Sequence, residues 1–362
     1  VISRNSSFAF RGQGQNLKQV ASELGARYIV EGSVRKGGNR VRITAQLIDA
    51  DEDHHLWSEK WDRTLEDIFE VQDEVSEAIA ARVAPAIAGK EQSRIKRNRP
   101  DNLSAWEKHL QGLRCFHERP RTDYEDAGLT EAKLHLKAAI AEDDSLADAH
   151  AHLALCSAVE LVQRLAKDRD QAMSLIFDHA RKAISLEAEN TMALSMLSAY
   201  YMFNGEIQNC HDYAQRAVKS NPSHVFGHQR LGMALNRMDR FEQAEPAFQK
   251  ALKLSPVDPE IWLVHVGCFY AFMGQAEYQN ALGACDRALA ANSKMGNLHG
   301  FRAAALGHLE RFGEAQKELA LYLEARPNLK TREDFHKLFF RNWIMTDILI
   351  EGLIKAGWEP ED

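Results

Sequence analysis

Apolar and polar residues follow two different patterns along the chain, and the amino-terminal part carries the mixed one. Apolar residues recur at helical spacing over residues 16–24, just before Gly25, which predicts a short amphipathic helix. Residues 28–35 are rich in β-branched and aromatic residues, and residues 41–47 alternate between apolar and polar. The turn residues Gly37-Gly38-Asn39 lie between these two runs, so we predict a β-hairpin with one buried face.

A third strand and a second helix extend this part of the chain. Residues 56–61 predict the strand, and residues 68–79 predict a helix that ends near Pro85. Residues 1–4 have the composition of the end of another strand. An antiparallel sheet covered by helices on one side would bury all of these apolar stripes. We therefore predict a small α/β module over residues 1–88.

Beyond this module the pattern becomes helical. Residues 89–100 hold a cluster of arginine and lysine and almost no apolar residue, which is typical of a basic, solvated linker. Helical periodicity then continues almost without interruption from residue 101 to the end. We expect the last part, residues 331–362, to form helices that cap the carboxyl-terminal end of the helical domain.

Prolines in the helical part fall at regular distances. Pro222 and Pro256 lie 34 residues apart, and Pro327 lies 71 residues further on, two periods plus three. A period of 34 residues is that of the tetratricopeptide repeat, a pair of antiparallel helices. The residues between these prolines resemble that repeat at its characteristic small and aromatic positions, which are Leu231, Gly232, Ala244, Phe248 and Ala251.

This resemblance implies a way of packing. Small residues such as Gly232 and Ala244 let two helices approach closely, and Phe248 fills the space between them. Each helix pair leaves one apolar face uncovered, and stacking the pairs covers it. We therefore expect a mostly α protein, with about six tetratricopeptide repeats over residues 101–330 forming a right-handed superhelix behind the small, truncated α/β module.

Composition narrows the classes of function. The 45 basic and 52 acidic residues give a net charge of -7, the wrong sign for a generally basic surface, so we expect no nucleic-acid partner. No apolar run is long enough to cross a membrane. Five cysteines without a CxxC pair predict reduced, buried thiols. We expect a cytoplasmic location. The chain starts at Val1 without a signal peptide, which we interpret as the carboxyl-terminal part of a longer protein; a preceding membrane span would make the location periplasmic.

Candidate chemical sites are few. Gly12-Gln13-Gly14 and Gly89-Lys90 lack the remaining residues of a phosphate-binding loop. Side chains that bind metals cluster before the third strand; they are Asp51, Asp53, His54 and His55. Adjacent strand residues point to opposite faces, which favours a turn over a metal site, and His150 and His152 are two apart on a helix. We expect no catalytic residue, metal or cofactor in this chain.

Three runs also resemble a bacterial module. Residues 1–8, 25–35 and 40–50 are similar to the TolB-amino-terminal-like (FlgO-like) module, and residues 351–357 resemble the carboxyl terminus of the same family. In that family the module precedes tetratricopeptide repeats in proteins that begin with a class III adenylate cyclase domain or a winged-helix DNA-binding domain. The resemblance implies an output domain outside this chain. It also implies that the opening strand and helix of the module are missing here.

Two classes of function remain. In the first, the chain is a non-catalytic regulatory region of a bacterial signalling protein: its repeats bind a peptide, a partner protein or a domain of the same polypeptide, and the α/β module links them to the output domain. In the second, it is the carboxyl-terminal part of an adenylate cyclase whose catalytic domain lies upstream. Cyclases need metal-binding aspartates on an α/β domain, so we expect no enzyme activity from this chain itself.

The inner groove of such an array is lined by fixed positions in the first helix of each repeat. In two copies these positions are mostly apolar or neutral, and they are Met192, Ser195, Ala199, Met202, Phe226, Gln229, Met233 and Asn236. We predict that the apolar members grip an apolar segment and that Gln229 and Asn236 fix its register. The alternative is that these side chains pack against a neighbouring helix, and their exposure distinguishes the two.

Overall fold

The computed structural model describes most of the chain. The described residues are 2, 4–10, 16–26, 28–38, 40–50, 54–64, 72, 75–76, 102–118, 127–163, 165–256, 260–292, 296–338 and 343–362. The chain divides into two compact units. One is Ser7–Leu103, and the other is Ser104–Asp362 together with Val1–Ser6.

Two short helices come first. Helix α1 (Arg4–Phe8) is helical where a strand end was predicted over residues 1–4, so that prediction is wrong at Arg4. Helix α2 (Leu17–Leu24) begins because the Asn16 side chain accepts a hydrogen bond from the Lys18 backbone amide. It ends at Gly25, whose φ of 60° is readily adopted by glycine. The predicted amphipathic helix is thereby confirmed.

The sheet contains β1 (Tyr28–Gly37), β2 (Arg40–Asp49) and β3 (His54–Thr64), in that order and antiparallel throughout. Gly38, at φ 63°, makes the turn between β1 and β2. The central strand carries the core of the sheet, with Val41, Ala45, Leu47 and Ile48 buried. The predicted hairpin and third strand are confirmed, but the predicted buried face is found on β2 and not on β1, which is exposed over nine of its ten residues. Most of the predicted helix over residues 68–79 and all of the predicted linker over residues 89–100 lie outside the described residues.

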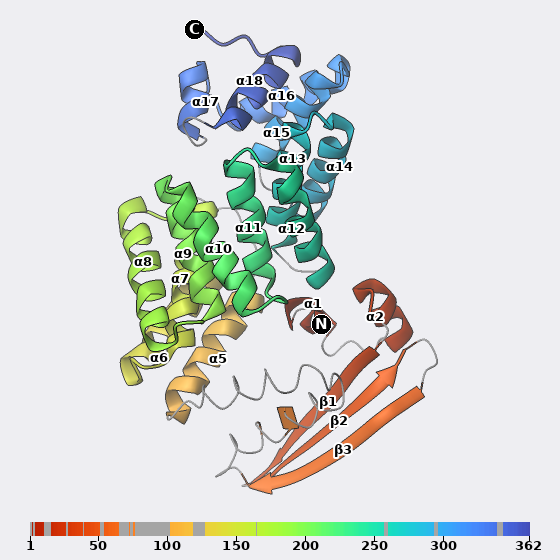
Figure 1. Ribbon diagram of the computed structural model, residues 1–362, viewed down its shortest axis with the longest axis vertical. Coiled ribbons are helices and arrows are strands. Elements are labelled where there is room, and N and C mark those ends of the chain that lie inside the picture. The colour runs from red at the N-terminus through yellow and green to blue at the C-terminus, as the bar shows by residue number, and fades with distance from the viewer. Residues whose placement is uncertain are drawn as a thin grey trace. The chain divides into compact units, whose positions relative to one another are not determined.

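The second unit is built from helices, and Figure 1 shows them following one another as antiparallel pairs. They are α5 (Leu103–Glu118), α6 (Ala127–Glu142), α7 (Ala147–Val162), α8 (Arg169–Leu186), α9 (Thr191–Asn204), α10 (Ile207–Ser220), α11 (Val225–Arg237), α12 (Phe241–Leu254), α13 (Ile261–Gly274), α14 (Tyr278–Ala291), α15 (Asn297–His308) and α16 (Phe312–Glu324). Polar side chains start several of these helices: Asn190 caps α9, Asp168 caps α8 and His224 caps α11.

The first helices of successive pairs contact one another and form what we call the inner layer: α7 packs against α9, α9 against α11, and α11 against α13. The stacked rings of Phe269 and Phe301, 5.1 Å apart, continue this layer from α13 to α15. The second helices, from α8 to α16, pack behind it. The protein is therefore mostly α, with a small antiparallel sheet before the helical repeats.

Phe248 shows how neighbouring pairs fit together. Its ring is fully buried, and an added Cβ on Gly232 would lie 2.7 Å from it, while one on Gly267 would lie 2.2 Å away. Any larger side chain at either glycine would overlap the ring, so α11 and α13 depend on glycine to pack on both sides of Phe248. This confirms the predicted role of Gly232 and Phe248.

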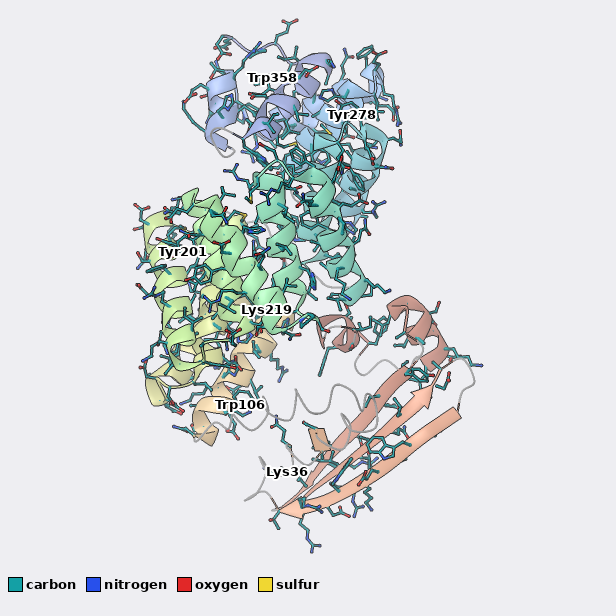
Figure 2. The ribbon with its side chains drawn as sticks, viewed as in Figure 1. Lys36, Trp106, Tyr201, Lys219, Tyr278 and Trp358 are labelled. Atoms are coloured by element: carbon teal, nitrogen blue, oxygen red, sulfur yellow. The ribbon has the colours of Figure 1, made fainter. Side chains whose placement is uncertain are left out.

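Two more helices, α17 (Arg332–Leu338) and α18 (Ile344–Lys355), follow the last pair. Helix α18 packs against α15 and also touches α13. Gly307 and Gly352 form the crossing point, where a Cβ on Gly307 would lie 2.0 Å from the Gly352 carbonyl oxygen. Figure 2 places Trp358 just beyond α18, and its ring lies 6.0 Å from that of Phe335 on α17. Among the described helices, none is both long and apolar enough to cross a membrane.

Candidate partner-binding face of the helical array

The structure divides the predicted groove residues into two groups. Ser195 and Met202 on α9 are buried, as are Gln229 and Asn236 on α11. The partly exposed members are Met192, Phe226 and Met233. Ala199, which the prediction placed between them, is fully buried.

The buried members hold the inner layer together. The Asn236 side-chain amide donates to the Gly267 carbonyl oxygen at 2.9 Å, which joins α11 to α13. The Ser195 hydroxyl donates to the Thr191 carbonyl oxygen, also at 2.9 Å, within its own helix. Met202 packs in a small cluster with Cys210. The contacts of Asn236, Ser195 and Met202 therefore lie within the array and support the face.

Two of the partly exposed members, Phe226 and Met233, lie where three apolar clusters meet. Phe226 packs against the cluster that contains Leu197 and Met196 of α9. Met233 packs against the large apolar cluster that includes residues of α13, and also against the small cluster around Met202. The exposed parts of these side chains therefore mark the join between α9 and α11.

Two arginines complete one stripe of α11 that sequence reasoning missed. Phe226, Arg230, Met233 and Arg237 follow each other at spacings of four, three and four residues, so they share one side of the helix. Arg230 is only 6% exposed. Both arginines lie near Cys210, at the start of α10. The helical spacing of two arginines around Met233 was the available signal, but sequence alone does not show that Arg230 is buried and Arg237 partly buried.

Arg230 is a buried cation without an acid beside it. Its Nε has no hydrogen-bond partner, and within the described part of the chain its guanidinium forms no ion pair. Loss of hydration disfavours the charged form and lowers the pKa of Arg230 to about 10. Burial also lowers the pKa of Arg237 to about 10, although Asp239 nearby opposes this shift. A positive charge removed from water gains stability when a negative group comes within reach.

The chain's own Trp343 occupies the other end of this stripe. Its indole N–H donates to the Asn236 carbonyl oxygen at 3.0 Å, and the Arg237 guanidinium carbon lies 5.0 Å from the centre of its ring. Tyr270 of α13 makes an edge contact with the same ring at 5.0 Å. Trp343 therefore fills the space between α11 and α13.

The segment from Trp343 through α18 runs along the inner layer. It touches α11 and α13 through Trp343, then packs on α15 through α18. A segment contacts α11, α13 and α15 together only if it lies across the first helices of these three pairs. The carboxyl-terminal part of the inner layer is thus covered by the protein itself, and the part around α9 and the start of α11 carries the partly exposed Met192 and Phe226.

Histidines form two contacts between helices in the first pairs. His150 Nδ1 of α7 lies 2.8 Å from His179 Nδ1 of α8, and His109 Nε2 of α5 lies 3.2 Å from His152 Nδ1 of α7. Each of the two histidines of α7 therefore faces a different helix. Burial, with a smaller contribution from the neighbouring His150, lowers the pKa of His179 to about 4. The neutral His150–His179 pair joins α7 to α8, and the His109–His152 contact joins α5 to α7.

Within the described ranges, no group of three or more metal-ligating side chains is found. Asp51 and Asp53, two members of the candidate metal cluster before the third strand, lie outside the described residues. The two candidate phosphate-binding loops also lie outside them. The cysteines are free thiols, and all except Cys115 are buried. Burial raises the pKa of Cys268 to about 12, which keeps this thiol protonated and unreactive at neutral pH.

Comparison with known proteins agrees with this arrangement. Residues 227–258, which include most of α11 and all of α12, match the tetratricopeptide repeat family. The helical array is a tetratricopeptide-repeat fold. A curated relative from Rhizobium meliloti (strain 1021), named "Putative adenylate cyclase 3", is 32% identical over 248 residues. The match covers 68% of this chain and 35% of the relative, so the chain spans about a third of that protein's length.

Solved structures with a similar helical arrangement include PilF of Pseudomonas aeruginosa, at 18% identity and a TM-score of 0.45, covering 62% of this chain and 93% of that chain. A chain of the APC/C hetero-tetramer Cut9–Hcn1 is similar at 16% identity and a TM-score of 0.48, covering 79% of this chain and 54% of that chain.

Proposed function

We propose that the tetratricopeptide repeats bind a protein or peptide along the inner layer where α9 meets α11. The observation that carries this proposal is the stripe on α11, in which the buried, unpaired Arg230 lies between the partly exposed Phe226 and Met233. Apolar side chains beside a guanidinium that lacks an acid form a surface that an acidic, partly apolar segment complements.

The partner's chemistry follows from this stripe. An apolar side chain of the partner would contact Phe226, Met192 and Met233, and a carboxylate would approach Arg230. The carboxylate gains a charge-assisted hydrogen bond, and Arg230 gains the negative charge that it lacks. Ser195, Met202, Gln229 and Asn236 would keep the layer in shape beneath these contacts. A domain of the same polypeptide fits this description as well as a separate protein.

For the longer protein, we propose a signalling role with the output domain outside this chain. The similarity to the named adenylate cyclase relative supports cyclase as the output, and the resemblance of residues 25–35 and 40–50 to the TolB-amino-terminal-like module extends to winged-helix regulators. We propose that the sheet unit is this module and that it links the repeats to the output domain in the cytoplasm. The chain itself would then be non-catalytic, and incubation with ATP and magnesium or manganese would yield no cyclic AMP.

Peptide selection tests the binding proposal directly. A displayed random-peptide library is selected on the intact chain, and enriched peptides are measured by isothermal titration calorimetry. We expect acidic, apolar peptides whose Kd rises roughly 30-fold for Phe226→Ser, the about 2 kcal/mol typical of a buried anchor. Arg230→Met, which keeps the bulk and removes the charge, would weaken the same peptides.

Phe312 provides the matched control, because it is a phenylalanine of α16 that is 51% exposed and far along the array from the stripe. Phe312→Ser would leave the Kd unchanged. Peptides that bind all variants equally, or a selection that enriches no acidic, apolar sequence, would contradict the proposed site.

A further inference from the structure

The outer edge of the sheet is formed by a long exposed strand. β1 pairs with β2 over ten residues without a shift in register, and among the strands that the structure describes β1 is the outermost on its side, as Figure 1 shows. Nine of its ten residues are exposed, including Val30 at 41% and Val34 at 69%. The outer row of backbone N–H and C=O groups on such an edge is a template for another strand.

Charges along β1 are unbalanced across the sheet. Arg35 lies opposite Arg42 in the pairing with β2, and Arg42 is held by Asp62 of β3 through an Nε to Oδ1 contact of 2.6 Å. Like charges opposite one another weaken a strand pair. Arg35 has no acidic partner in the described part of the chain. A negative group on the other side of Arg35 would relieve this repulsion.

Glu31 is that complementary group on the same strand. It lies two residues from Ser33 on one side, as Arg35 does on the other, and all three share one face of the sheet. Its carboxylate accepts a hydrogen bond from the Gln46 side chain at 2.9 Å and has no cation opposite it. The strand is therefore charge-complementary to an inverted copy of itself.

We propose that two copies of this chain pair through β1, antiparallel, about a two-fold axis at Ser33. The two sheets then become one continuous sheet, and Glu31 of each copy lies opposite Arg35 of the other. Across the polar face, one row would then contain Asp62, Arg42 and Arg35 of one copy followed by Glu31 of the second copy. Asp62 on one side and Glu31 on the other would offset the repulsion between Arg35 and Arg42. This dimer is independent of the proposed partner-binding face.

Other registers fit less well. Residues opposite each other must share a face of the sheet, so the axis has to pass through a residue of the strand. An axis at Gly32 would place Ile29 opposite Arg35, and one at Val34 would place Ser33 opposite it. Only the axis at Ser33 forms two Glu–Arg pairs at once. It also brings Val34 of the two copies diagonally together on the apolar face. Lys36, labelled in Figure 2 near the end of β1, would lie opposite Val30.

Charge reversal tests this register. The mass of the intact chain is followed by sedimentation equilibrium over a range of concentrations. We expect the wild type to dimerise, and Glu31→Arg and Arg35→Glu each to raise the dimer Kd tenfold or more because like charges then face each other. The double variant restores two opposite-charge pairs and would return the Kd to within about threefold of wild type. Arg63→Glu on β3, at the opposite edge, is the matched control and would leave the Kd unchanged.

A cysteine at the axis provides a second measurement. Directly opposite residues of antiparallel strands have Cα atoms about 4.5–5.5 Å apart, which a disulfide spans. Ser33→Cys would therefore form a covalent dimer under mild oxidation, and the wild type, in which Cys115 alone among the cysteines is not buried, is the control for background cross-linking.

Circular dichroism of each variant establishes that the fold is kept. A wild type that stays monomeric at about 100 μM would overturn the proposal. So would a dimer that both single reversals leave intact, a double variant that fails to recover, or a folded Ser33→Cys variant without the cross-link, because each result would mean that β1 does not pair at Ser33.

Discussion

The first and second halves of the helical array join their helices by different means. In the first half, from α5 to α10, polar side chains bridge the helices. In the second half, from α11 to α18, glycines receive aromatic rings or a neighbouring backbone, in addition to hydrogen bonds such as that from Asn236 to Gly267. The same helix pair can thus be joined by hydrogen bonds or by close steric fit, and the two kinds of joint respond to different disturbances.

Contacts in the first half show the polar kind. The two Nδ1 atoms of His150 and His179 lie 2.8 Å apart. The side-chain amide of Asn190 donates to Asp148 at 2.8 Å, and Lys133 forms an ion pair with Glu160 at 2.6 Å. Joints of this kind depend on the protonation state of their members.

Contacts in the second half show the steric kind. An added Cβ would come within 2.3 Å of the Phe241 ring at Gly274, and within 2.9 Å of the Tyr322 ring at Gly300. Close packing of this kind tolerates neither a cavity nor an extra methyl group. It also lets α18 lie directly on α15, which covers the inner layer there and restricts the proposed partner site to α9 and α11.

The largest expected effect comes from removing the central ring of the second half. Phe248→Ala would leave a cavity beneath both Gly232 and Gly267 and lower the free energy of unfolding by about 3–5 kcal/mol. Urea unfolding followed by circular dichroism measures this change. Phe312→Ala, at an exposed phenylalanine, is the control and would cost less than about 1 kcal/mol. Equal effects at the two sites would contradict the steric account.

A single added methyl group tests the crossing of α15 and α18. Gly307→Ala would force the two backbones apart and destabilise the array by about 1–3 kcal/mol. Gly313, in α16, has nothing within 4 Å of an added Cβ, so Gly313→Ala would be neutral or slightly stabilising. Urea unfolding measures the change in unfolding free energy for both variants. An unchanged unfolding free energy in Gly307→Ala would mean that α18 does not lie this close to α15.

Acid would weaken the polar joint of the first half. His179 faces His150, Asp178, Lys137 and Asp144, and its pKa falls from an ordinary 6.5 to about 4 in the folded state. The unfolded chain therefore binds this proton first, so the stability from neutral His179 is complete above pH 6.5 and is lost as the pH falls towards 4.

We expect this loss to be about 1–2 kcal/mol, because His179 is partly exposed and solvent screens the shift. His179→Gln cannot titrate and would show a shallower decline in unfolding free energy between pH 6.5 and 4 than the wild type does. His55→Gln, at an exposed histidine of β3, would decline as the wild type does. Identical declines in all three proteins would refute the role of the pair.

The smallest effect concerns Trp343. Trp343→Phe keeps most of the ring and removes the hydrogen bond to the Asn236 carbonyl, which would cost about 1 kcal/mol in urea unfolding. Faster hydrogen exchange of the amides at the end of α11 would accompany it. A change confined to α18 would show that the tryptophan does not hold α11.

Periodicity predicted most of the fold because it reports which faces are buried. The 34-residue spacing of Pro222 and Pro256 gave the helix pairs, and alternation over residues 41–47 gave the central strand. Local patterns were insufficient at residues 1–4, where β-branched residues were read as a strand end but Arg4 begins α1. Five helical residues supply too little periodicity to be distinguished from a strand.

The candidate site was harder to predict, because the repeat phase indicates on which side of a helix a residue lies but not how deeply its side chain is buried. Phe226 and Met233, which the repeat phase assigned to the groove, are partly exposed on α11, but Gln229 and Asn236 are buried and hold the layer. Arg230 was missed because burial of a charged side chain depends on neighbouring helices. The covering of α11 by Trp343, 107 residues later in the chain, depends on long-range contact and leaves no local signal.

A double-mutant cycle between Arg230 and a bound peptide tests the central claim most directly. A selected acidic peptide and its Glu→Gln or Asp→Asn variant are titrated calorimetrically into the wild type and into Arg230→Met. If the carboxylate meets Arg230, we expect a coupling free energy of about 1.5 kcal/mol or more. A coupling near zero for every acidic position of the peptide would show that Arg230 does not receive the partner.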